Sequence, residues 1–167
     1  MKLQLVTPIG LKRDEEVYEV ILPTMDGEIG VLPGHEPLVT LLDVGIMSVR
    51  AQKNDSDEAM EHFAVSTGIA EIDGSRVLIL ADEADEGDDI AEQEAKAALE
   101  RAQKMRAEAS DQVAITEAEK LLKRHTTQLK VAELRRHHRK SRLTWNANNM
   151  KRAKQVDELD KKDDSKT

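Results

Sequence analysis

The chain has 167 residues, a net charge of −8 and no cysteine. Its length suggests one or two domains with a modest core. The acidic balance argues against general nucleic-acid binding, and the lack of cysteine excludes disulfides and thiolate metal sites. Charged residues follow soon after Pro8, before any signal-peptide core forms, and no apolar run approaches the ~20 residues of a membrane helix. We therefore expect no direct membrane insertion.

Composition changes near Gly87. All 8 glycines and all 4 prolines lie at or before this residue. Residues 1–87 carry 6 Lys and Arg against 18 Asp and Glu, whereas residues 88–167 carry 19 against 15. Frequent turn residues followed by none are typical of strands followed by helices. We predict a β + α two-domain protein: a sandwich domain over 1–87, a helical hairpin over 88–140, and a charged, disordered or fraying tail over 141–167.

Short runs rich in Val, Ile and Leu, flanked by turn residues, predict eight strands in the first domain. They are Leu3–Val6, Val17–Leu22, Glu28–Leu32, Leu38–Leu42, Ile46–Ala51, His62–Ser66, Gly68–Ile72 and Val77–Ala81. Asp73 and Gly74 mark a hairpin turn between the last two. Strands at this spacing indicate an antiparallel β-sandwich or flattened barrel. Only Tyr18 and Phe63 are aromatic in this half, so we expect an aliphatic core.

Residues 30–38 pack two prolines, two glycines and a histidine between two of these strands. Pro33 fixes φ, and Gly34 supplies a conformation that a β-carbon opposes. A phosphate-binding loop needs a lysine and a following helix, and neither is present. No serine or cysteine nucleophile stands beside His35 for it to activate. We predict a rigid corner that His35 fills or hydrogen-bonds.

Residues 27–38, which read Gly-Glu-Ile-Gly-Val-Leu-Pro-Gly-His-Glu-Pro-Leu, resemble the signature loop of the epsilon subunit of F-type (proton-translocating) ATP synthases. Further matches are the segments Leu3–Pro8, Ser66–Ile72 and Val77–Asp82, and the resemblance covers residues 1–137. It implies an N-terminal β-sandwich, a C-terminal helical hairpin and no catalytic residues. It also implies a non-catalytic rotor subunit of F1, or CF(1), that serves ATP synthesis coupled to hydrogen ion transport.

The resemblance also implies the partners of the sandwich. The sandwich is expected to bind the gamma subunit and to rest on the membrane ring of c subunits, on the cytoplasmic side of the cell inner membrane, as a peripheral subunit. Glu28 matches the family glutamate that meets polar loops of the ring, where an exposed anion would face basic residues. We expect Pro33, Gly34 and His35 to form a stiff corner that holds Glu28 against the turning partner.

The second half predicts two helices. Asp89, with Glu92 three residues later, predicts a capped helix start. A seam with heptad spacing follows at Ala91, Ala95, Ala98, Ala102, Met105 and Ala109. Ser110 and Asp111 interrupt it and supply a new cap. The second seam comprises Ile115, Ala118, Leu122, His125, Leu129 and Ala132, and two such helices joined by a short break predict an antiparallel hairpin.

His125 lies mid-seam, where an apolar residue is expected. In one interpretation its ring reaches the edge of the seam and only packs there. In the other it is a switch, because burying a protonated imidazole is costly and would loosen the hairpin.

A basic cluster follows the second seam, at Arg135, Arg136, His137, His138, Arg139, Lys140 and Arg142. By itself it suits a helix C-terminus, or binding to acidic lipid or nucleic acid. Trp145 is the only aromatic residue nearby and no recognition module is visible, which argues against nucleic acid. The resemblance implies that the C-terminal helices swing up, that Arg135, Arg136, Arg139 and Lys140 approach acidic segments of the beta subunits, and that ATP hydrolysis is inhibited.

Some members of the resembled family bind ATP on the hairpin through the motif Ile/Leu-Asp-x-x-Arg-Ala. The aligned residues 90–95 here read Ile-Ala-Glu-Gln-Glu-Ala. Ala91 replaces the aspartate, and Glu94 replaces the arginine that would meet phosphate. We therefore expect no cofactor and no ATP sensing by this route.

Two other classes of function remain open from the residues. An enzyme that uses His35 with Glu36 or Glu28 would show turnover by the isolated chain. A free-standing β-sandwich adaptor with a basic helical arm would be a stable monomer that does not copurify with gamma.

Overall fold

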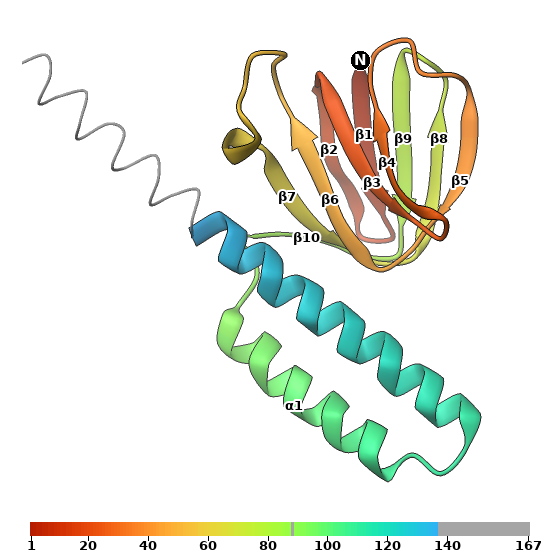
Figure 1. Cartoon of the computed structure of the whole chain (residues 1–167), viewed down its shortest axis with the longest axis vertical. Helices are drawn as coiled ribbons and strands as arrows, with labels where there is room; N and C mark the ends of the chain where they lie inside the picture. Colours follow the sequence, from red (N-terminus) through yellow and green to blue (C-terminus); the bar gives the residue numbers. More distant parts are fainter. Residues whose placement is uncertain (88, 137–167) are drawn as a thin grey trace, which may run out of the picture. The chain divides into compact units, whose positions relative to one another are not determined.

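The computed structural model describes residues 1–87 and 89–136 (Figure 1). Met1–Arg135 form one compact unit. Within the described residues, ten strands precede two α-helices, and a short 3-10 helix, η1 (Asp57–Ala59), lies between two of the strands. The predicted fold class, a β-sandwich or flattened barrel followed by a helical hairpin, is confirmed.

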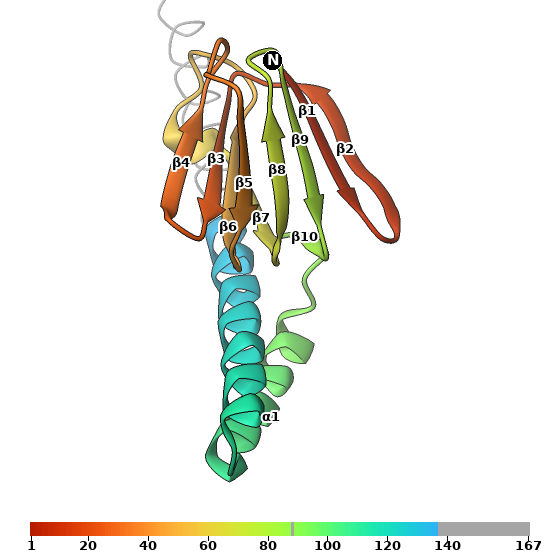
Figure 2. The same ribbon diagram turned by 90° about the vertical axis from the view of Figure 1, so that its right-hand side faces the viewer.

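The strands form one continuous sheet that folds into two layers (Figure 2). They are β1 (Lys2–Thr7), β2 (Gly10–Glu16), β3 (Glu19–Thr24), β4 (Gly27–Val31), β5 (Leu38–Leu42), β6 (Gly45–Arg50), β7 (Glu61–Val65), β8 (Gly68–Ile72), β9 (Arg76–Ala81) and β10 (Ala84–Glu86). Their order is β10-β7-β6-β3-β5-β8-β9-β1-β2, with β4 paired to β3. The pairing is antiparallel except between β1 and β9. The layers join where β3 pairs with β5 through Thr24 and Leu42 alone.

The core between the layers is aliphatic, as predicted. Leu3, Leu5, Leu22, Met47 and Ile79 are fully buried. Phe63 is the one aromatic residue of the core cluster. Successive side chains along a strand point to opposite faces of the sheet, so they alternate between the core and the outer surface.

The sequence predicted eight strands, and β2 and β10 were missed. β2 reads Gly-Leu-Lys-Arg-Asp-Glu-Glu and has no buried residue, so it lacks the apolar alternation that marks a strand. It is an edge strand, where charge prevents pairing with other molecules. Lys2 on β1 and Asp14 on β2 form a cross-strand ion pair of 2.9 Å. β10 is only three residues long and pairs with β7.

The helices are α1 (Glu92–Glu108) and a second helix that covers residues 112–136 of the described chain. The predicted cap at Asp89 is wrong. α1 begins at Glu92, so Ala91 holds the N-cap position, and alanine has no side-chain oxygen for a capping hydrogen bond. Asp89 instead lies in the preceding turn, where its N–H donates to the Glu86 carbonyl oxygen at 2.9 Å. The predicted cap at Asp111 is correct: its Oδ1 accepts from the Ala114 N–H at 2.8 Å.

The helices pack through a narrower seam than predicted. Ala95, Ala102, Ala118 and Ala132 are buried. Met105, in contrast, is 48% exposed. Ala91 and Ala109 occupy the N-cap and C-cap positions of α1 and lie outside the helix itself. The helices are also tied by an ion pair of 2.9 Å between Arg106 Nε and Glu119 Oε1. No helix in the described part of the chain is long and apolar enough to cross a membrane.

Candidate partner-binding surfaces

The predicted corner is a loop fixed to the turn between β8 and β9. Gly34 has φ 85° and donates its N–H to the Gly74 carbonyl oxygen at 2.8 Å. The His35 N–H donates to the Leu32 carbonyl oxygen at 3.0 Å, and its Nδ1–H donates to the Glu36 carbonyl oxygen at 2.7 Å. Both His35 contacts lie within the corner, so the ring serves as a local anchor there.

The turn beneath the corner is itself held by a carboxylate. Asp73 Oδ1 accepts from the Ser75 N–H at 3.1 Å, from the Ser75 hydroxyl at 3.0 Å and from the Arg76 N–H at 2.8 Å. The hydrogen bonds from Ser75, backbone first, lower the pKa of Asp73. The corner and the turn therefore form one braced end of the sandwich.

Glu28 does not belong to this corner. It is exposed and lies opposite Pro23 in the register of β3 and β4, next to the turn that joins them. Pro33, Gly34 and His35 follow the other end of β4. The expectation that the corner holds Glu28 is therefore corrected: the pairing of β4 with β3 holds it.

The sandwich also has an exposed apolar row that sequence reasoning missed. On the outer face of β5, β8, β9, β1 and β2, strands that lie side by side in Figure 2, the register pairs Leu41 with Ile69, Ile69 with Leu80, Leu80 with Val6 and Val6 with Leu11. Leu41 is 59% exposed and Leu11 is 57% exposed. We call these five residues the outer-face row. Exposed contiguous apolar patches mark interaction sites.

A sequence signal for this row existed. β9 reads Arg-Val-Leu-Ile-Leu-Ala, which is apolar at both strand parities. Such a strand is typical of a sheet that is covered on both faces. Among the residues that the structure describes, only the face with Val77 and Ile79 is covered, and Leu80 on the opposite face is exposed.

The second helix touches the sandwich through a face separate from the seam. Lys123 Nζ pairs with Asp43 Oδ2 at 2.5 Å, and Arg124 Nη2 pairs with Glu83. Gln128 Nε2 donates to Asp85 Oδ2 at 2.7 Å. The side-chain hydrogen bond from Lys123 lowers the pKa of Asp43.

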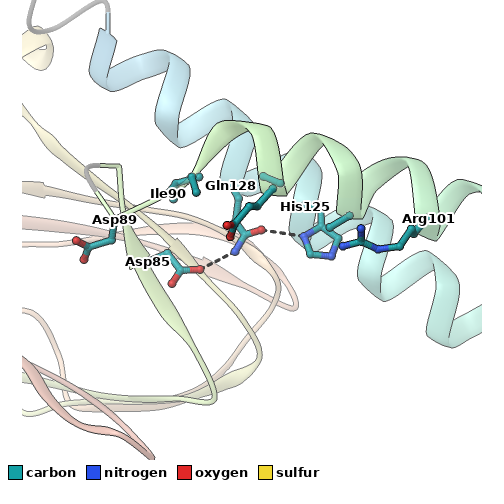
Figure 3. Close-up of a pocket in the computed structure, with 10 residues that line it drawn as sticks. Asp85, Asp89, Ile90, Arg101, His125 and Gln128 are labelled. Carbon is teal, nitrogen blue, oxygen red and sulfur yellow. Dashed lines mark hydrogen bonds between the residues drawn. The ribbon is translucent and has the colours of Figure 1, made fainter.

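His125 is half-buried and is linked to the sandwich through hydrogen bonds of Gln128 (Figure 3). Its Nδ1–H donates to Gln128 Oε1 at 2.9 Å, and Nε2 of the same Gln128 amide donates to Asp85 Oδ2. Because a carbonyl oxygen only accepts, Nδ1 carries a proton in this arrangement. The role of His125 as a switch stays a prediction.

A cavity of about 290 Å³ lies between the segment after β10, α1 and the second helix (Figure 3). It is lined by Asp85, Asp89, Ile90, Ala91, Glu94, Ala95, Ala98, Arg101, His125 and Gln128. Both substituted positions of the ATP motif therefore face the cavity. The lining offers three carboxylates against one guanidinium, which is unfavourable for a polyphosphate.

The basic cluster is only partly described. Arg135 packs against Gly87, where an ideal β-carbon would lie 3.0 Å from Arg135 Cβ, and Arg136 is exposed. Arg139 and Lys140 lie outside the described residues. In the described part of the chain, no group of three or more His, Asp or Glu side chains is arranged to hold a metal ion.

The β-sandwich matches a known family. A family model described as "ATP synthase, Delta/Epsilon chain, beta-sandwich domain" matches residues 1–87. The chain belongs to this family. It is similar to the ATP synthase epsilon chain of Carboxydothermus hydrogenoformans, at 40% identity over 61% of this chain and 72% of that protein. It is also similar to the chloroplastic ATP synthase epsilon chain of Adiantum capillus-veneris, at 34% identity over 80% of this chain and 98% of that protein.

Solved structures agree with the family. A chain of the Euglena gracilis mitochondrial ATP synthase, solved as an OSCP/F1/c-ring assembly, superposes with a TM-score of 0.65 at 26% identity, covering 78% of this chain and 79% of that one. The predicted epsilon-type resemblance is thereby confirmed. As a family member the chain is a non-catalytic, central-stalk subunit of ATP synthase, and the enzyme alternative built on His35 is dropped.

Proposed function

We propose that the chain binds the gamma subunit through the outer-face row and couples gamma to the c-ring. The observation that carries this proposal is the run of apolar side chains across five adjacent strands, four of them exposed and Val6 half-buried. A non-catalytic stalk subunit transmits torque only if its partner surface is stiff, and a row on paired strands is stiffer than a loop. A gamma subunit that offers an apolar face would remove these side chains from water.

The test is copurification with gamma. Leu41→Glu with Ile69→Glu places two charges inside the proposed interface, and we expect gamma binding to weaken by about tenfold or more. Val113→Glu is the matched control, because Val113 is 69% exposed but lies on the second helix. Equal gamma binding by all three proteins would contradict the proposal.

The ring contact is proposed at Glu28, with Pro33, Gly34 and His35 as further partner positions. Glu28 is an exposed carboxylate beside a tight turn, which suits an encounter with basic loop residues. On this proposal the subunit is peripheral on the cytoplasmic side of the inner membrane. Glu28→Lys should reduce proton pumping per ATP hydrolysed in membrane vesicles, whereas Glu100→Lys on α1 should not. Unchanged coupling in the Glu28 variant would refute the contact.

The hairpin is proposed to regulate hydrolysis through the beta subunits. Arg135 and Arg136 begin a cationic segment that Arg139 and Lys140 continue, and acidic segments of beta would attract it. The alanine seam buries little area, so the hairpin opens at low cost. ATPase activity of the whole complex should rise when this chain is ended at Gly87, with assembly retained. Equal rates would exclude regulation by the hairpin.

We also infer that this hairpin does not sense ATP. The carboxylates of Asp85, Asp89 and Glu94 around the cavity support this proposal, because they repel phosphate. Isothermal titration of the chain with ATP should give no binding signal. Ala91→Asp with Glu94→Arg restores the resembled motif and should create one. Binding by the unaltered chain would overturn the inference.

His125 is the proposed pH-responsive residue of the hairpin. Protonation would add a charge to a half-buried ring beside Gln128. His125→Ala should then remove any pH dependence of hairpin opening between roughly pH 5 and 8. A pH dependence that survives in this variant would mean that the ring only packs.

A further inference from the structure

The second helix has a docking face with a regular composition. Arg124, Gln128, Val131 and Arg135 follow one another at spacings of four, three and four residues, which places them along one side of a helix. Val131 is fully buried although it is not part of the predicted seam. Val131 and Arg135 both approach Gly87, since an ideal β-carbon there would lie 3.4 Å from the Val131 carbonyl oxygen.

The sandwich meets this helix with three carboxylates from two places in the chain. Asp43 lies between β5 and β6, Glu83 lies between β9 and β10, and Asp85 lies on β10. They receive Lys123, Arg124 and Gln128 respectively. Two of these contacts pair opposite charges, and the third is a hydrogen bond from a neutral amide to a carboxylate.

We propose that Asp43, Glu83 and Asp85 form an ionic latch that holds the second helix on the sandwich and sets how readily the hairpin is released. This inference rests on the proposed regulatory hairpin and names its control. The latch needs no nucleotide, since all of its contacts come from the chain itself. An acidic partner surface would compete with these carboxylates for Lys123 and Arg124.

The contacts are suited to a reversible latch. The paired side chains of Lys123 and Asp43 remain 49% and 34% exposed, and those of Arg124 and Glu83 36% and 42%. Ion pairs between side chains this exposed are individually weak and are screened by salt. The Glu83 Oε2 atom that meets Arg124 is itself buried, so salt should screen this pair less than the Lys123–Asp43 pair. The two ion pairs and the Gln128–Asp85 hydrogen bond together hold the helix, yet moderate competition releases it.

The latch can be tested in the full chain with a thiol pair. The protein has no cysteine, so Gly87→Cys with Arg135→Cys introduces the only two thiols. Their β-carbons would be about 3.0 Å apart, so a small shift brings them to the separation of a disulfide. Equilibration with a glutathione redox buffer gives the effective concentration of the pair, which reports the docked population.

In this background, Asp43→Asn, Glu83→Gln and Asp85→Asn should each lower the effective concentration by about two- to five-fold. The triple variant should lower it by more than tenfold. Salt near 1 M should lower it in the parent and have little further effect in the triple variant. Asp26→Asn is the matched control, because it removes one carboxylate of the sandwich at an exposed turn away from the helix contacts.

A charge swap keeps the test valid if a single variant disturbs folding. Arg124→Glu alone should undock the helix, and Glu83→Arg in the same chain should restore docking. The latch would be overturned if the effective concentration did not change with the three substitutions or with salt. It would also be overturned if the charge swap did not restore docking, or if the thiol pair never formed a disulfide.

The latch and the proposed inhibition fail in different ways. If the latch variants undock the hairpin but the ATPase of the complex responds to neither undocking nor truncation at Gly87, the latch stands and inhibition is wrong. If truncation raises ATPase activity while the latch variants leave docking unchanged, inhibition stands and the latch is wrong.

Discussion

The sandwich and the hairpin bury apolar side chains of different size. The sandwich core contains fully buried leucine, isoleucine, valine and methionine side chains, while the buried seam positions of the hairpin are alanines. Each buried methylene contributes about 0.8 kcal/mol, so an alanine seam contributes far less than a leucine core of equal length. The comparison teaches that the two domains of one chain are stabilised by different amounts of buried apolar area, with the smaller amount in the hairpin. The hairpin depends on contacts outside its own seam.

The largest expected effect tests the sandwich half of the comparison. Leu22→Ala removes a fully buried side chain from β3, and we expect the free energy of unfolding to fall by about 2–5 kcal/mol. Leu129→Ala in the hairpin removes the same atoms from a half-buried site and should cost less than half as much. Urea unfolding followed by circular dichroism measures both. Equal losses would show that the two domains are equally well packed.

The next effect tests the seam. Ala102 is 1% exposed, so Ala102→Leu has no room between the helices and should destabilise the hairpin by about 1–3 kcal/mol. Ala97→Leu is the matched control, because Ala97 is exposed on the same helix. Hydrogen exchange of α1 amides should accelerate in the first variant alone, with sandwich amides unchanged. Slower exchange in Ala102→Leu would mean that the seam has spare volume.

A smaller effect tests the stiffness of the braced end of the sandwich. Gly34→Ala puts a β-carbon on a residue with φ 85°, which should cost about 1–2 kcal/mol. Gly30→Ala in β4 is the control, because its β-carbon would meet nothing closer than Glu19 Oε1 at 4.0 Å. Thermal unfolding compares the two. Equal melting temperatures would show that the left-handed conformation at Gly34 is not required.

The sequence predicted the elements whose signal is local. Eight strands, the turn at Gly74 and the cap at Asp111 follow from apolar runs and turn residues within a few positions, and the structure has all of them. The family resemblance was carried by residues 27–38 and is confirmed by the family model. β2 was missed because an edge strand needs no apolar alternation.

The missed surfaces depend on partners distant in sequence. Lys123 meets Asp43 across 80 residues and Gln128 meets Asp85 across 43, so no local pattern joins them. Leu41 and Leu80 reach one row only through the order of β5, β8 and β9. The side-chain types were readable from sequence, but their neighbours required the sheet order. The cap at Asp89 was wrong because α1 begins at Glu92, which places Ala91 and not Asp89 at the N-cap position.

The smallest expected effect concerns pH and the contact between the two domains. The hydrogen bond from Lys123 lowers the pKa of Asp43. A carboxyl whose folded-state pKa is depressed stabilises the docked state above its ordinary value near pH 4, and this contribution is lost as the pH falls through the lower, docked value. Asp43 is partly exposed, so we expect no more than about a two-fold change in docking from this residue. The thiol-pair assay is not suited to acid, so hydrogen exchange of the second helix between pH 3 and 5, corrected for intrinsic rates, provides the measurement. Asp43→Asn should flatten the acid response, and Asp26→Asn should leave it intact. An acid response that Asp43→Asn does not alter would leave the Lys123 contact without a part in holding the hairpin.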